Sequence, residues 1–282
     1  NQVTLKVGAA VVAGCTMVLK PSEESPLDAM IFAEMMDEAG FPKGVFNLVN
    51  GDGVGVGTQL SCHKDVDMIS FTGSTRAGTL ISKAAADTLK KVHLELGGKG
   101  ANIIFNDADD KAVKRGVLHM MNNTGQSCNA PSRMLVQSDV YDKAVEEAGK
   151  VAAQVTVGPA SQEGRHIGPV VIADVTPDMT IAREEIFGPV LSIMKFDTEE
   201  QAVQIANDTV YGLTNYVQSQ DGARRNRLAR QLRSGMVEMN GQGRAAGSPF
   251  GGMKQSGNGR EGGLYGIEDF TEIKAVSGWA AE

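Results

Sequence analysis

Short apolar runs alternate with amphipathic stretches along the first part of the chain. The runs have the length and side-chain content of buried strands, and they lie at 16–20, 45–49, 68–72 and 91–95. Apolar positions at helical spacing mark residues 26–39 and about 74–87, and a glycine-rich turn with a short helix follows residue 49. Strands that alternate with helices in this way predict a parallel sheet with helices on its faces.

A second unit with the same alternation begins past residue 97. Its predicted strands lie at 101–105, 133–137, 190–196 and 236–239, and its predicted helices at 109–122, 139–155, 198–208 and 222–232. Residues 241–263 are rich in glycine and predict a long functional loop, and residues 271–277 predict a terminal strand. The chain is therefore predicted to belong to the α/β class, with two units.

Composition narrows the classes of function. The 282 residues are 41% hydrophobic and 22% charged, which is typical of a soluble globular protein with room for two domains. A net charge of −7 argues against a nucleic-acid-binding protein. The arginines between 224 and 233 are interpreted as the solvated face of one helix. No apolar run is long enough for a membrane span and no leader is visible, so the cytoplasm is the default compartment and no membrane partner is expected.

Cysteines and histidines are few. Cys15, Cys62 and Cys128 are scattered and form no Cys-x-x-Cys pair, which indicates free thiols in a reducing compartment. The four histidines are dispersed along the chain, so no metal site is predicted.

Three motifs carry candidate chemistry. The run Asn-Thr-Gly-Gln-Ser-Cys ends at Cys128, the run Leu-Glu-Leu-Gly-Gly-Lys contains Glu95, and Arg-Glu-Glu-Ile-Phe-Gly-Pro occupies 183–189. A thiolate attacks carbonyl carbon readily, and a glutamate can activate the water that releases the acyl group. Backbone donors of the Gly125–Gln126 turn could stabilise an oxyanion. Taken singly, Cys128 could be a buried structural thiol and Glu95 a charge at a strand end.

Two glycine-rich turns and one acidic strand end are suited to a nucleotide. Gly73 and Ser74 lie where a strand leads into a helix, whose free N–H groups can meet a phosphate, although Ser74 is a helix N-cap in any case. The turn 51–57 follows another strand but departs from the dinucleotide pattern at Thr58. The strict Gly-x-Gly-x-x-Gly at 257–262 lacks a preceding strand and is rejected.

Lys20 and Glu23 end the strand 16–20. A glutamate there can accept hydrogen bonds from both hydroxyls of a ribose and would repel a 2′-phosphate, although both residues could also be plain surface charges.

Together, and in this order, the three motifs resemble the NAD(P)-dependent aldehyde dehydrogenase superfamily, over nearly the whole chain. The resemblance implies an aldehyde dehydrogenase-like fold with a Rossmann-type cofactor domain, incomplete here, at 1–96 and an α/β catalytic domain at 97–256. It also implies a tail at 257–282 whose last strand joins another subunit of a homodimer or homotetramer. The implied reaction is NAD-dependent oxidation of an aldehyde to a carboxylic acid, through a thiohemiacetal and a thioester on Cys128, with Glu95 as the base that activates water.

The resemblance also assigns the cofactor-binding residues, which are Lys20, Glu23, Gly53, Gly57, Gly73, Ser74, Leu96, Glu185 and Phe187. Glu23 favours NAD over NADP. Two alternatives stay open: a CoA-acylating relative, in which a thiol resolves the thioester, and a catalytically inactive binding or structural relative. A Ser-based hydrolase is disfavoured because the sequence has no Gly-x-Ser-x-Gly elbow.

The chain departs from the family pattern in two places. The first strands of the cofactor domain and an oxyanion-binding asparagine have no counterpart, and several dozen residues are absent between Ile172 and Ala173. We therefore expect the protein to be longer than 282 residues. We also expect Ile172 and Ala173 to lie farther apart than the roughly 3.8 Å of bonded neighbours.

Overall fold

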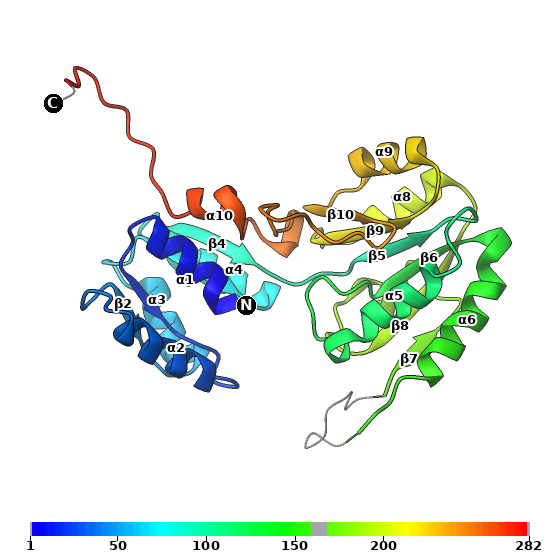
Figure 1. Ribbon diagram of the computed structural model, residues 1–282, viewed down its shortest axis with the longest axis horizontal. Coiled ribbons are helices and arrows are strands. Elements are labelled where there is room, and N and C mark those ends of the chain that lie inside the picture. Colours follow the sequence, from blue (N-terminus) through cyan, green and yellow to red (C-terminus); the bar gives the residue numbers. More distant parts are fainter. Residues whose placement is uncertain (1, 159–167, 281–282) are drawn as a thin grey trace.

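The computed structural model describes residues 2–158 and 168–280, which form two groups of strands and helices (Figure 1). In the first group the predicted strands are all present: β1 (Met17–Leu19), β2 (Phe46–Leu48), β3 (Met68–Thr72) and β4 (Lys91–Glu95). Its helices are α1 (Gln2–Val12), α2 (Leu27–Glu38), α3 (Thr58–Cys62) and α4 (Thr75–Ala86), with a π-helical turn at Gly53–Gly57. The predicted α/β alternation is thus confirmed.

The strands of the first group pair in parallel, as predicted, but not in one sheet. β1 pairs with β2 and β3 pairs with β4, and within the described residues no strand joins the two pairs. In parallel strands that follow one another, the side chains at their carboxyl ends meet at the same edge. The segments after β1 and β2 therefore lie together, as do those after β3 and β4.

The second group is built on one six-stranded parallel sheet in the order β10-β9-β5-β6-β8-β7. Its strands are β5 (Ala101–Ile104), β6 (Arg133–Gln137), β7 (Val170–Ile172), β8 (Val190–Phe196), β9 (Thr214–Gln218) and β10 (Met236–Met239). Its helices are α5 (Ala112–Met121), α6 (Tyr141–Ala153), α7 (Thr180–Arg183), α8 (Glu199–Asn207) and α9 (Gly222–Gln231). Apolar side chains pack on both faces of the sheet, against α5 and α6 on one face and α8 and α9 on the other.

Several elements were not predicted. They include α1, β7, α7, the central strand β9, and α10 (Gly263–Glu268), which lies at the end of the predicted glycine-rich loop. The predicted strand at 271–277 is absent, because these residues leave the body of the single chain and have no strand to pair with. Residues before that point are held on β4, where the Gly259 N–H donates to the Leu94 carbonyl at 2.9 Å and the Leu94 N–H donates to Asn258 Oδ1.

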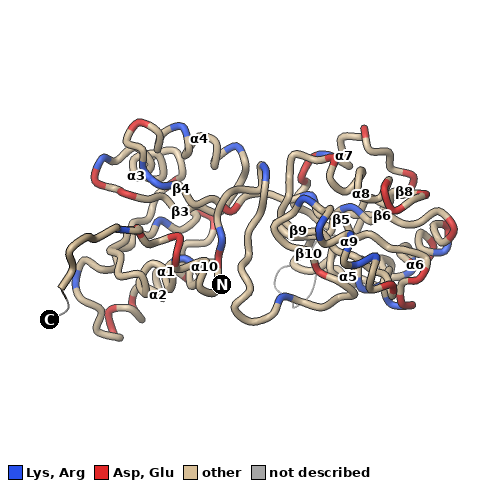
Figure 2. Tube along the Cα trace, turned by 90° about the horizontal axis from the view of Figure 1, so that it is seen from above, with Lys and Arg blue, Asp and Glu red and all other residues tan. Residues whose placement is uncertain are grey.

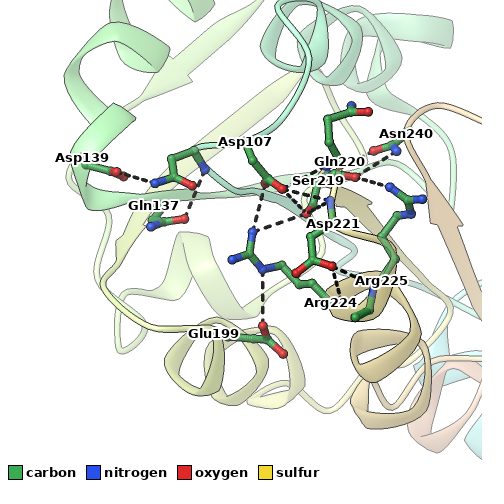
Figure 3. Close-up of polar contacts among 12 residues, drawn as sticks. Asp107, Gln137, Asp139, Glu199, Ser219, Gln220, Asp221, Arg224, Arg225 and Asn240 are labelled. Atoms are coloured by element: carbon green, nitrogen blue, oxygen red, sulfur yellow. Dashed lines mark hydrogen bonds and ion pairs between the residues drawn. The ribbon is translucent and has the colours of Figure 1, made fainter.

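The arginine cluster lies mostly on α9 and is held by carboxylates of the same sheet edge (Figure 3). Arg224 Nη1 lies 3.0 Å from Asp107 Oδ1, and both Arg224 and Arg227 pair with Glu199. In Figure 2 basic and acidic residues are interspersed over both groups. Arg224, Arg225 and Arg227 therefore join α9 to its neighbouring segments. Arg227, Arg230 and Arg233 are also exposed, as expected for the predicted solvated face. In the part of the chain that is described, no helix is long and apolar enough to cross a membrane.

Candidate active site

The first predicted cofactor residues meet where β1 and β2 end. Glu23 Oε1 accepts a hydrogen bond from the Gly53 N–H at 3.2 Å, and Lys20 Nζ lies 3.3 Å from Glu23 Oε2. Lys20 also donates to the Gly51 carbonyl, and a Cβ on Gly57 would lie 3.9 Å from the Lys20 side chain. Hydrogen bonds from the backbone and from Lys20 lower the pKa of Glu23, so it is an ionised acceptor. Lys20, Glu23, Gly53 and Gly57 thus lie together, as predicted.

A second group of predicted residues gathers where β3 and β4 end. Ser74 caps α4 through its Oγ, which accepts from the Ala77 N–H, and the Gly73 N–H donates to the Glu95 carbonyl at 3.1 Å. Leu96 packs on α4 at Gly78, where a Cβ would lie 2.7 Å from its methyl carbons. A depression of about 470 Å³ borders α4 and includes Leu96, but neither Cys128 nor Glu95 lines it.

Glu95 is a buried carboxyl group without a hydrogen-bond partner among the described residues. Its side chain is 2% exposed, and neither carboxyl oxygen is bonded. Burial raises the pKa of Glu95 to about 8, and the nearby Glu261 carboxylate adds to the shift while Lys6 opposes it. Gly251 lets the backbone approach this group, since a Cβ there would lie 2.8 Å from Glu95 Oε1. A carboxyl group with a pKa near neutral is suited to general base catalysis.

Cys128 lies on a loop that packs closely against the backbone of Gly98. A Cβ on Gly98 would lie 2.1 Å from the Cys128 carbonyl oxygen, so only glycine allows this contact. The loop begins with left-handed residues, Asn123 and Thr124, and continues through Gly125 with φ of +70°. The Gln126 N–H donates to the Asn123 carbonyl, so it is engaged and not free for an oxyanion. The backbone N–H groups of Cys128 and Asn129 favour the ionised form of the thiol and so lower its pKa.

The thiol of Cys128 is not activated in this structure. A depressed pKa is what helix ends or cations would give, but burial raises the pKa of Cys128 to about 11. The carboxyl groups of Glu95 and Glu185 add to this shift, and the backbone N–H groups oppose it only in part.

Glu185 and Phe187 lie beside Gly98 and the loop that carries Cys128. Glu185 Oε1 accepts from the Gly98 N–H at 2.9 Å, and a Cβ on Gly97 would lie 2.2 Å from Glu185 Oε2. Phe187 has a left-handed backbone, with φ of +55°, and its side chain is half exposed. A small cavity joins the segments, lined among others by Gly98, Ser127, Glu185 and Phe187.

The sheet explains how these residues meet. Gly98 precedes β5, Cys128 precedes β6, and Phe187 precedes β8, so their segments enter neighbouring parallel strands at the same edge. That edge faces the carboxyl ends of β3 and β4, where Glu95 lies. Tyr216 on β9 was not among the predicted site residues, and its hydroxyl donates to the Asn129 carbonyl at 2.6 Å. It is one of two tyrosines between α8 and α9, and no motif distinguishes it from Tyr211.

Comparisons with known proteins agree with this arrangement. The family model described as "Aldehyde dehydrogenase family" matches residues 1–171 and 159–276. The chain is 49% identical to 3-succinoylsemialdehyde-pyridine dehydrogenase of a Pseudomonas species over 323 aligned positions, which cover 99% of this chain and 68% of that protein. The alignment is longer than this chain, and the family match falls in two parts that overlap at 159–171. The prediction of a longer protein stays a prediction.

Solved structures show the same fold. An aldehyde dehydrogenase from Bartonella henselae superposes with a TM-score of 0.96 at 56% identity, covering 99% of this chain and 68% of that one. A cysteine-to-alanine mutant of aldehyde dehydrogenase C from Pseudomonas syringae, in complex with NAD+ and octanal, has a TM-score of 0.96 at 43% identity and covers 100% and 67%. Sequence, fold and site therefore agree that this chain belongs to the aldehyde dehydrogenase family.

Proposed function

We propose that this chain oxidises an aldehyde to a carboxylic acid with NAD as the hydride acceptor, using Cys128 as nucleophile and Glu95 as general base. The observation that carries the proposal is the pair formed by the buried Glu95 and the partly buried Cys128. Glu95, unpartnered and with its pKa raised to about 8, lies close enough to Cys128 to raise the pKa of the thiol.

The residues present fit a dinucleotide. Glu23 is an ionised, half-exposed acceptor beside the glycine turn, which suits the hydroxyls of a ribose. The N-terminus of α4 at Ser74 offers backbone N–H groups to a phosphate. Gly97 and Gly98 carry no Cβ, which lets Glu185 and the loop of Cys128 approach the backbone closely. When bound, NAD supplies the acceptor for the hydride that leaves the aldehyde carbon.

Cys128 forms and holds the covalent intermediates. Its Sγ adds to the aldehyde carbon and gives a thiohemiacetal. Loss of hydride converts this into a thioester on the same sulfur. Because burial holds the thiol protonated, its proton must pass to solvent before Sγ attacks the aldehyde carbon.

Glu95 then takes a proton from water, and the hydroxide attacks the thioester carbon. The bond from that carbon to Sγ breaks, the acid leaves, and Cys128 is restored. The CoA-acylating alternative has no need of a water-activating base, so the buried carboxyl group of Glu95 favours hydrolysis. The presence of Cys128, the buried carboxyl group of Glu95 and the ionised Glu23 supports an active enzyme over the inactive alternative.

A self-associating cytoplasmic enzyme is the assembly we propose. Exposed apolar side chains on the C-terminal segment support it, since Ile273 is 100% and Trp279 is 80% exposed. The three cysteines are free thiols, which suits a reducing compartment.

NADH formation measured at 340 nm with a panel of aldehydes, octanal and a semialdehyde included, tests the proposal. Wild-type protein should form NADH, and Cys128→Ala should form none while its NAD affinity, measured by calorimetry, stays unchanged. Cys62→Ala is the matched control and should retain full turnover. Turnover by Cys128→Ala would remove Cys128 from the mechanism.

A further inference from the structure

Two side-chain hydrogen bonds converge on the residue that follows Cys128. Tyr216 Oη donates to the Asn129 carbonyl at 2.6 Å, and Ser127 Oγ donates to Asn129 Oδ1 at 2.8 Å. The second bond joins the two residues that flank Cys128. Asn129 is thus tied on its backbone to β9 and on its side chain to Ser127.

Tyr216 is itself held rigidly. It lies on β9, between β10 and β5 in the six-stranded sheet, where Asn102 of β5 is its partner, and it is 4% exposed. Its ring packs edge-on against His119, with centroids 5.0 Å apart, and above Gly100. Burial raises the pKa of Tyr216 well above its usual range, so its hydroxyl is a donor throughout the pH range of the protein.

The loop needs such ties because it has little regular structure of its own. Two successive non-glycine residues, Asn123 and Thr124, are left-handed, and the stretch from Gln126 to Ser132 lies between the short helix Asn122–Gly125 and β6. A displacement of about 1 Å in a reacting group can cost a large factor in rate. The Tyr216 hydroxyl, fixed on the interior strand β9, restricts the movement of Asn129 and, through the peptide bond, of Cys128.

We propose that Tyr216 is a positioning residue for Cys128 and acts through the Asn129 carbonyl. The hydrogen bonds from Tyr216 and from Ser127 to Asn129 together form a brace that holds the loop. Tyr216 does not touch the reacting atoms. The inference rests on the proposed function only in that it takes Cys128 as the nucleophile. It adds a residue from a strand that no motif of the sequence marked.

The test compares Tyr216→Phe with Tyr265→Phe, a control at a tyrosine that is 58% exposed on α10. The assays are kcat, KM for NAD, the melting temperature, and the rate of alkylation of Cys128 by iodoacetamide, read by mass spectrometry against Cys62, which is exposed. We expect Tyr216→Phe to lower kcat about tenfold, the equivalent of one buried hydrogen bond, with KM for NAD unchanged. Alkylation of Cys128 should become several-fold faster, because the loop exposes the thiol more often.

A loss of turnover together with a gain in thiol accessibility distinguishes positioning from general destabilisation. A lower melting temperature with kcat and alkylation equal to those of the control would overturn the proposal. Ser127→Ala removes the other bond and should change both readouts in the same direction; no change there would remove Ser127 from the brace. If wild-type protein formed no NADH from any aldehyde, the proposed function would fail, and the alkylation rates would still test the brace.

Discussion

Replacing Glu95 by glutamine should make the protein more stable and slower at once. A carboxyl pKa raised from 4.5 to about 8 corresponds to about 5 kcal/mol of free energy against the ionised form. The folded state therefore holds a proton that the unfolded state releases, so the wild type loses this much stability as pH rises from about 4.5 through 8. A glutamine at position 95 has nearly the same shape but does not ionise. The variant therefore does not lose this stability as pH rises.

The melting temperatures of wild type and Glu95→Gln, measured from pH 5 to pH 8.5, provide the assay. The difference between them should widen in favour of the variant by roughly 10 °C toward the alkaline end, since 1 kcal/mol is worth about 2–4 °C in a domain of this size. Glu24→Gln, at an exposed carboxylate, is the control and should show no such trend. A difference that is constant with pH would refute the assignment of a buried, protonated Glu95.

Kinetics of the same variant separate the two half-reactions. Rapid mixing with aldehyde and NAD should give one NADH per Cys128, followed by a steady state slowed about 10²- to 10⁴-fold, the usual contribution of a general base. Full steady-state turnover would show that another base serves.

Two further outcomes follow from the geometry. Glu23→Gln should raise kcat/KM for NADP relative to NAD about tenfold, because the like-charge contact with a 2′-phosphate is removed; a ratio that does not move, measured with both cofactors, would exclude Glu23 from that contact. Gly98→Ala should abolish NADH formation, because its Cβ would lie 2.1 Å from the Cys128 carbonyl oxygen, whereas Gly149→Ala, in α6 with open space around it, should leave turnover intact and stabilise the helix by about 0.5–1 kcal/mol in urea unfolding; equal activities would contradict the close contact.

Apolar runs and helix caps made most elements predictable from the sequence. Strands β3, β4, β6 and β10 have the predicted bounds, and Ser74 and Thr198 cap the helices that they precede. The strand β9 escaped prediction because its sequence, Thr-Asn-Tyr-Val-Gln, is mostly polar. Its polar side chains are buried, and those of Asn215, Tyr216 and Gln218 are paired with groups on other segments. Such pairing depends on the partner strand.

The candidate site, too, could be predicted from the sequence only in part. Motifs identified Cys128, Glu95 and Glu185, because their chemistry is local to each run of residues. The ionisation of Cys128 could not be anticipated, since it depends first on burial and then on two carboxyl groups 33 and 57 residues away in the sequence. The contact of Gly98 with the Cys128 carbonyl and the bond from Tyr216 to Asn129 likewise arise only when β5, β6 and β9 are side by side.

Gly98, Cys128 and Glu185 lie just before the amino ends of strands in the six-stranded sheet. This position has a consequence for insertions into the chain. A strand advances about 3.3 Å per residue, so a single insertion between Cys128 and β6 would shift the nucleophile by that distance against Gly98 and Glu185. An insertion at the opposite edge, where β6 and β8 leave the sheet, would move none of the three. The turns on that far edge are therefore the places where this chain can accept a tag or a reporter and keep its site in register.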